Sequence, residues 1–293
     1  MAKARELRRR IRSVEKTRQI TKTMEMVATS KLKRAQDRVV AARPYAAALA
    51  DAIADLFQPE LSQQFPLLRP VAQPRRVALV VITSNRGLCG GFNANLIRMG
   101  RQRLAELAGD GVEVELHAIG RKGIGYFRYV GQALASQRQD IGDRPTPAHA
   151  VDVVEPLMAR FERDELDAVE VVFAKFNSPV STPPTLLRIL PIVPPGRQDG
   201  MTARRHAANY LLRPSAEELV GAILPLYVHN QMYRALVETA AAEQGARRTA
   251  MKNATDSAGD MIDWLRRTYN RARQAQITQE IAEIVGGSEA LKG

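Results

Sequence analysis

The sequence is poor in the residues on which many enzymes, secreted proteins and membrane proteins depend. It contains one cysteine in 293 residues, which excludes an internal disulfide and is typical of a reducing compartment. No apolar run approaches the ~20 residues that a membrane-spanning helix needs. No apolar stretch follows the basic start, and Glu6, Glu15 and Glu25 argue against a transit peptide, so we expect that start to be structural. Aromatic residues, at 5%, are too few for a bulky interior and favour long helices.

The positive charge of the chain is concentrated at its N-terminus. Residues 1–43 hold 14 Lys and Arg against 4 Asp and Glu, which accounts for +10 of the net +12. The segment 204–293 contributes +2, and the middle of the chain is neutral. This distribution indicates a basic N-terminal segment with an acidic partner, which could be nucleic acid, anionic lipid or an acidic protein surface.

The N-terminal segment 1–57 shows the apolar spacing of a long helix. Steps of three and four residues place one line of side chains on a single face: Leu7, Ile11, Val14, Ala28, Leu32, Ala35, Val39, Ala42, Ala46, Leu49, Ile53 and Leu56. Within this line Arg18, Thr21 and Glu25 are polar, and the apolar residues of that span are on another face. A local stutter in packing and a second partner explain this break equally well.

The C-terminal segment 210–286 repeats the pattern at similar length. Ser215 and Glu218 have the spacing of a capping box, and Gly286-Gly287 is a typical helix end. The predicted apolar line contains Leu219, Ile223, Leu226, Tyr233, Val237, Ala240, Met251, Ala254, Ala258, Met261, Leu265, Ala272 and Ala275. Pro44 in the first helix and Pro225 in the second are expected to bend them.

Two helices of this length must cover each other's apolar faces. We therefore predict an antiparallel, left-handed coiled coil between the two ends of the chain. The C-terminal helix is the longer by roughly 20 Å at 1.5 Å per residue, so its tip should project alone. There Ile277, Ile281 and Ile284 would need another protein to cover them.

The segment 76–200 between the helices has a different pattern. β-rich runs at 76–84, 112–120, 168–176 and 185–193 alternate with helical segments near 93–108 and 148–163. This alternation predicts a Rossmann-like α/β domain with a mostly parallel sheet, inserted into the coiled coil. Pro-rich stretches at 58–75 and 194–203 are interpreted as linkers.

A glycine-rich turn, "TSNRGLCGGFNAN" (83–95), resembles a phosphate-binding loop only at first sight. It lacks the Lys-Ser/Thr of a Walker loop and the spacing of a dinucleotide fingerprint, so we interpret its glycines as turn residues. No histidine is near Cys89 in the sequence, and a buried, unreactive thiol is favoured. The four histidines have no metal-ligand spacing. We expect no catalytic, cofactor or metal site.

The two ends of the chain carry a specific resemblance. "RRRIRSVEKTRQITKTMEMVATSKLKRAQ" and "YNRARQAQITQEIAEIVGG", together with "ITSNRGLCGGFNANL", closely resemble the gamma subunit family of F-type ATP synthases. The resemblance implies a non-catalytic rotor shaft that couples proton flow to ATP synthesis. It implies alpha and beta subunits, an epsilon subunit and a membrane ring of c subunits as partners, with catalysis on the beta subunits.

The resemblance also implies which residues transmit force to the surrounding subunits. They are Lys22, Met24 and Val27 near the N-terminus, Arg247 in the polar break of the C-terminal helix, and Arg273, Gln274, Thr278 and Glu280 near its tip. The chain lacks the cysteine pair of chloroplast members, which excludes their redox switch. A bacterial-type subunit, peripheral on the cytoplasmic face of the cell membrane, is expected.

Two other functions would explain parts of the sequence. A nucleic-acid-binding coiled coil would explain the basic segment, but the chain lacks interleaved aromatics and a recognised binding motif. A nucleotide-dependent enzyme built on the α/β domain would explain the glycine-rich turn. Tight, salt-dependent DNA binding would support the first, and micromolar nucleotide affinity would support the second.

Overall fold

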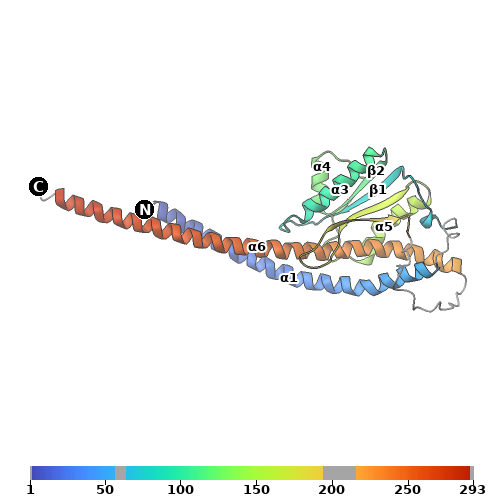
Figure 1. The fold of residues 1–293 in the computed structure, drawn as a ribbon, viewed down its shortest axis with the longest axis horizontal. Coiled ribbons are helices and arrows are strands. Elements are labelled where there is room, and N and C mark those ends of the chain that lie inside the picture. Colours follow the sequence, from blue (N-terminus) through green and yellow to red (C-terminus); the bar gives the residue numbers. More distant parts are fainter. Residues whose placement is uncertain (1, 57–63, 194–215, 291–293) are drawn as a thin grey trace. The chain divides into compact units, whose positions relative to one another are not determined.

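A computed structural model describes residues 2–56, 64–193 and 216–290. Two helices dominate it: α1 (Ala2–Leu56) and α6 (Ala216–Ala290) (Figure 1). Both continue through their internal prolines, Pro44 and Pro225. Ser215 lies outside the described residues. The expected end at Gly286-Gly287 is wrong, because α6 continues through both glycines to Ala290.

The contacts of the chain divide it into two compact units, and each contains part of both helices. Unit 1 consists of residues 1–28 and 247–293, and unit 2 of residues 29–246. Neither helix ends where one unit passes into the other. Among the described residues, no helix is both long enough and apolar enough to cross a membrane.

Unit 2 contains a five-stranded sheet of order β3-β2-β1-β4-β5. Its strands are β1 (Arg76–Ile82), β2 (Glu113–Ile119), β3 (Ser136–Arg138), β4 (Ala168–Ala174) and β5 (Pro184–Leu190). All neighbouring pairs are parallel except β4 and β5, which are antiparallel. The predicted mostly parallel, Rossmann-like domain is therefore confirmed, and its strand order is that of doubly wound folds.

The helices of unit 2 cover both faces of this sheet. They are α3 (Phe92–Gly109), α4 (Arg121–Tyr129) and α5 (Pro147–Glu162), besides α6 (Figure 1). Alternate residues of β1 point to opposite faces, as the period of two requires. Leu79 and Val81 belong to the buried cluster that contains residues of α3 and α4, whereas Ala78 and Val80 belong to the cluster that contains residues of α5; α6 contributes to both clusters.

Three parts of unit 2 differ from the sequence prediction. The short strand β3 and the helix α4 were not predicted. Part of the expected 58–75 linker is a 3₁₀ turn, η1 (Pro66–Leu68), whose Leu67 and Leu68 are buried in the core. The expected linker at 194–203 lies outside the described residues.

The helix α6 is buried on all sides in the middle of unit 2. Every residue from 235 to 245 is buried there. The β4 strand ends against this stretch, where the Ala174 amide donates to Thr239 Oγ1 at 3.2 Å and the Phe176 amide donates to Glu238 Oε2 at 3.1 Å. The predicted apolar line is wrong around Leu226, which is exposed, because Leu224 and Val228 occupy the core instead.

A buried carboxylate joins α3 to the sheet. Glu170 in β4 is 1% exposed and accepts from Arg103 Nε at 2.7 Å and from Arg188 Nη2 at 2.8 Å. Burial by itself raises the pKa of the Glu170 carboxyl, but the hydrogen bonds and charges of the two arginines outweigh it. The pKa is therefore lowered from its ordinary value of 4.5, and the carboxylate stays ionised at neutral pH.

We expect Glu170→Gln to destabilise the chain by about 3 kcal/mol at neutral pH, because it leaves two arginines without their buried partner. A group with a lowered pKa in the folded state contributes stability above its unfolded pKa and loses it as the pH falls. The difference between wild type and variant should therefore shrink below about pH 4.5. Urea unfolding between pH 7 and pH 3.5 measures it. The control is Glu113→Gln, at an exposed carboxylate of β2. Equal losses of stability in both variants would contradict the stabilising role of the buried Glu170 carboxylate.

Gly120 marks the closest approach of two backbone segments in unit 2. Its φ is +95°, and a Cβ atom there would overlap the carbonyl group of Thr83. We expect Gly120→Ala to cost about 3 kcal/mol or more, since backbone strain and steric overlap add. Gly125 in α4 has no neighbour within 4 Å of a Cβ position, so Gly125→Ala should stabilise by about 0.5–1 kcal/mol. Thermal unfolding of both variants tests this, and similar shifts in both would refute it.

Candidate functional site

All eight predicted contact residues lie in unit 1, where α1 and α6 run antiparallel. Two cross-helix contacts fix the register: Thr21 Oγ1 is 2.8 Å from Thr255 Oγ1, and Arg266 Nη2 is 2.8 Å from Glu15 Oε1. Thr21 pairs with Thr255, and the earlier residue Glu15 pairs with the later residue Arg266, so the two helices run in opposite directions. The interior of unit 1 on the α6 side contains Met251, Thr255, Ala258, Ile262 and Leu265.

One residue of the polar break in the first apolar line, Thr21, belongs to the buried seam, whereas Arg18 is exposed. Thr21 is 9% exposed and Thr255 is 7% exposed, although both are polar. The Thr255 hydroxyl is also 2.8 Å from the Met251 carbonyl oxygen, and the Thr21 hydroxyl donates to the Arg18 carbonyl at 3.0 Å. These hydrogen bonds satisfy the two hydroxyls without water. The seam keeps its register through the break, so the stutter interpretation fails.

Apolar side chains in the same span of α1 face outward instead. Ile20, Met24 and Val27 are spaced by four and three residues, which places them in one row on the helix, and they are 56%, 38% and 50% exposed. Lys22 lies on the other flank of the seam, where it forms an ion pair with Glu25 at 3.2 Å. An exposed apolar row beside the buried pair of Thr21 and Thr255 favours the second interpretation, that this part of α1 faces a partner.

The four predicted residues near the tip share one side of α6. At 100° per residue, Arg273, Gln274, Thr278 and Glu280 fall within the same half of the helix as Ile277, Ile281 and Ile284. All of them are exposed. Their local hydrogen bonds stay within the helix, such as Gln276 Nε2 to Glu280 Oε1 at 2.8 Å. The side chains are thus available to another surface.

The eight residues form two regions and not a single site. Lys22, Met24 and Val27 lie at the level of Thr255, as the Thr21 contact shows. Arg273 is 18 residues further along α6, or roughly 27 Å at 1.5 Å per residue. Arg247, which is half-buried, is eight residues before Thr255 on α6, or roughly 12 Å, and so belongs to the first region. Sequence reasoning missed the paired threonines, although their heptad positions could have revealed them, and it placed the exposed Met261 in the seam.

The glycine-rich turn is part of the core of unit 2. Cys89 is 2% exposed, as expected, and its sulfur accepts from Asn93 Nδ2 at 3.2 Å. Gly90 has a φ of +58° and needs its glycine, but Gly91 has an ordinary φ of −79°. Gly90 and Gly91 both lie in the turn, but of these two only Gly90 has a backbone conformation that requires glycine. Leu88 also has a positive φ, of +62°.

Buried side chains pack together at the place where doubly wound folds usually bind ligands. In such folds the crevice lies beyond the carboxyl ends of the strands, where the strand order reverses, here beside β1 and β4. Cys89, Phe176 and Val237 belong to one buried cluster at this place. Glu238 and Thr239 of α6 bind the backbone at the end of β4.

The described histidines have structural contacts. His117 Nδ1 is 2.7 Å from Ser136 Oγ, and burial lowers the pKa of this ring. His149 forms a capping box with Thr146 at the start of α5. His229 Nε2 lies 2.6 Å from Glu155 Oε2. His206 lies outside the described residues. No group of His, Cys, Asp and Glu that could hold a metal is found in the described parts of the chain.

Comparisons with known proteins agree with the resemblance. The ATP synthase family model matches residues 3–291. The chain is 57% identical over 296 residues to the ATP synthase gamma chain of Gemmatimonas aurantiaca, and 44% identical over 294 residues to that of Desulfitobacterium hafniense. Both alignments cover 100% of this chain and 100% of the relative.

Solved structures show the same fold. A chain of the central stalk and c-ring structure of Tetrahymena thermophila mitochondrial ATP synthase is 25% identical, with a TM-score of 0.61. The match covers 80% of this chain and 99% of that chain. A chain of the Euglena gracilis mitochondrial enzyme has a TM-score of 0.69 at 20% identity, covering 99% and 95%. The family model and the full-length identities place this chain in the ATP synthase gamma chain family.

Proposed function

We propose that the chain is the central rotor shaft of an F-type ATP synthase. It couples proton flow through the membrane c-ring to the conformational cycle of catalytic beta subunits. The single observation that best supports this is the full-length identity of 57% to a bacterial gamma chain. The structure adds physical support, because α1 and α6 continue without interruption from unit 2 into unit 1. Continuous helices are suited to carrying a twisting load.

The surface of unit 1 has the asymmetry that a rotor needs. Coupling through rotation requires each surrounding subunit to meet a different face of the shaft in turn, so that the shaft favours a different state in each. One flank of α1 presents the apolar row Ile20, Met24 and Val27, and the other presents Lys22. The α6 tip presents mixed polar and apolar residues on one side. A hexamer of alpha and beta subunits would meet these faces successively.

The proposed role of the chain is mechanical, with ATP chemistry on the beta subunits. The crevice that would hold a nucleotide in this fold contains buried side chains of the chain itself. Cys89 is enclosed in the core, where its sulfur is 3.2 Å from Asn93 Nδ2 and 4.0 Å from the Arg86 carbonyl oxygen. These observations weaken the alternative of a nucleotide-dependent enzyme, because such an enzyme would need a base to stack in that crevice.

The proposed partners follow from the shaft role. The segments 1–57 and 210–286 would enter the alpha and beta hexamer, and the α/β domain at 76–200 would meet the epsilon subunit and the c-ring. The complex would hold the chain peripherally at the cytoplasmic face of a bacterial membrane. Lys22, Met24, Val27, Arg247, Arg273, Gln274, Thr278 and Glu280 would transmit force without taking part in chemistry.

We expect Arg273→Ala combined with Gln274→Ala to weaken coupling or assembly and to leave the fold intact. Both side chains are exposed, so the stability of the isolated chain should change by less than about 0.5 kcal/mol. The ratio of proton pumping to ATP hydrolysis in reconstituted vesicles should fall about fivefold, the lower range of allosteric coupling energies. Yield of the assembled complex measures the effect on assembly.

The control is Gln279→Ala combined with Glu283→Ala. These residues are also exposed, and the helical period places them on the side of α6 away from Ile277 and Ile281. The control should assemble and couple like wild type. A tip variant that assembles fully and synthesises ATP at the wild-type rate would remove Arg273 and Gln274 from the proposed contact surface. Equal losses in both variants would point to a general effect on the helix.

A further inference from the structure

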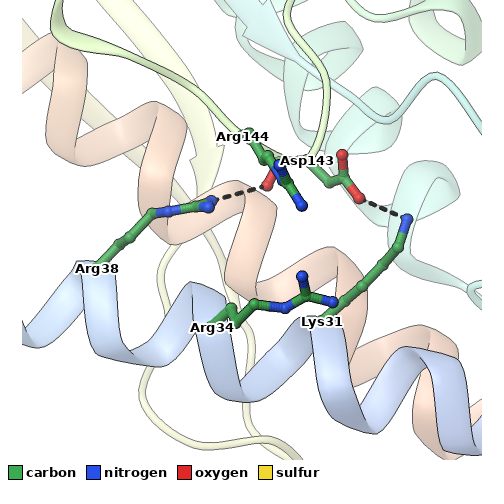
Figure 2. Close-up of a pocket in the computed structure, with 5 residues that line it drawn as sticks. All are labelled: Lys31, Arg34, Arg38, Asp143 and Arg144. Atoms are coloured by element: carbon green, nitrogen blue, oxygen red, sulfur yellow. Dashed lines mark hydrogen bonds and ion pairs between the residues drawn. The ribbon is translucent and has the colours of Figure 1, made fainter.

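Four cationic side chains surround a small hollow on the surface of unit 2 (Figure 2). Lys31, Arg34 and Arg38 come from α1, where their spacing of three and four residues aligns them on one side of the helix. Asp143 and Arg144 come from the segment that precedes α5. The hollow has a volume of about 180 Å³. All five residues belong to the same compact unit.

The one carboxylate of this hollow is already engaged. Lys31 Nζ lies 2.6 Å from Asp143 Oδ2, and Arg38 Nη1 donates to the Asp143 carbonyl oxygen at 3.2 Å. The hydrogen bond and charge of Lys31 hold the pKa of the Asp143 carboxyl below its ordinary value, although partial burial opposes this. Asp143 is therefore ionised at neutral pH and neutralises one cation of the four.

The remaining charge is carried mainly by Arg34 and Arg144. Among the residues that the structure describes, Arg34 forms hydrogen bonds only within its own helix turn, at 3.5 Å to the Ser30 carbonyl oxygen and 3.4 Å to the Ser30 hydroxyl. Within the described residues the Arg144 side chain has neither a hydrogen bond nor an ion pair. Figure 2 shows both guanidinium groups extending into the space between α1 and the Asp143 segment. The Arg144 guanidinium and the Nη1 group of Arg34 are thus left to donate to a ligand.

Converging guanidinium groups repel one another, and an anion placed between them would remove this repulsion. We propose that the hollow is a binding site for a phosphate group. A phosphate offers oxygens in several directions, so Arg34 on one wall and Arg144 on the other can each donate paired hydrogen bonds to it. Lys31 and Arg38, held in place by Asp143, supply further positive charge at the edge.

The size and composition of the hollow favour a compact oxyanion over a peptide. A volume of about 180 Å³ admits one phosphate group with some water, whereas an acidic peptide needs an extended groove. The five lining residues are all charged, with no apolar wall for a side chain or a base to contact. The phosphate could be inorganic phosphate or the headgroup of an anionic lipid, which share this chemistry. The proposal is independent of the rotor role, since it rests only on unit 2.

The experiment measures binding to the full-length chain by calorimetry. Inorganic phosphate is titrated at constant ionic strength, with chloride as the reference anion, and vesicles containing phosphatidylglycerol form a second arm. We expect saturable phosphate binding that weakens at least tenfold in Arg34→Gln combined with Arg144→Gln. Asp143→Asn should instead strengthen binding several-fold, because it removes the competing negative charge. Circular dichroism verifies that each variant is folded.

The control removes the same charge elsewhere, through Arg101→Gln combined with Arg271→Gln, both exposed. It should bind phosphate like wild type. Saturable binding of vesicles alone, lost in the Arg34 and Arg144 variant, would support the site and identify lipid phosphate as the source. Equal weakening in the control, absence of saturable binding in both arms, or a preference for polyglutamate over phosphate would each overturn the proposal.

Discussion

The complete burial of α6 between residues 235 and 245 is the constraint on which the architecture of unit 2 depends. A helix that is enclosed on every side needs small residues where neighbours approach closely. At Gly245 a Cβ atom would lie 2.9 Å from the Pro179 carbonyl oxygen, closer than a side chain tolerates. Ala240, Ala241 and Ala242 are buried in the same stretch. Glu238 and Thr239 provide the acceptors that the end of β4 needs.

This burial changes what the Rossmann-like sheet can be used for. In a doubly wound enzyme the strand ends beside the reversal of strand order are left open for a ligand. Here residues of α6 and of the glycine-rich turn belong to one buried cluster, and Cys89 is part of the core. The energy of burying these side chains stabilises the attachment of the long helix. The fold therefore acts as an anchor for a shaft, and the buried Glu170 with its two arginines ties α3 to the same sheet.

The sequence predicted the elements whose patterns were simple. Each of the four predicted β-rich runs overlaps a strand of the sheet. The heptad line of α1 matches the buried face of that helix at Ala28, Leu32 and Ala35. The buried face of α6 was harder to predict, because a helix that is buried on several sides does not show a single apolar stripe in its sequence. The strand β3, with the sequence "SQR", has no apolar signal and is held by pairing with β2.

The candidate contact residues came from the family resemblance, and the structure adds a physical reason for part of them. Hydrophobicity alone would bury Met24 and Val27 and expose Thr21, yet the reverse is observed. Paired hydroxyls can satisfy each other inside the seam, so Thr21 and Thr255 cost little when buried together. Met24 and Val27 then lie on the flank of the seam, where a partner can cover them. A seam that included Met24 would bind the two helices more tightly but would leave unit 1 with one less feature for a neighbouring subunit to distinguish.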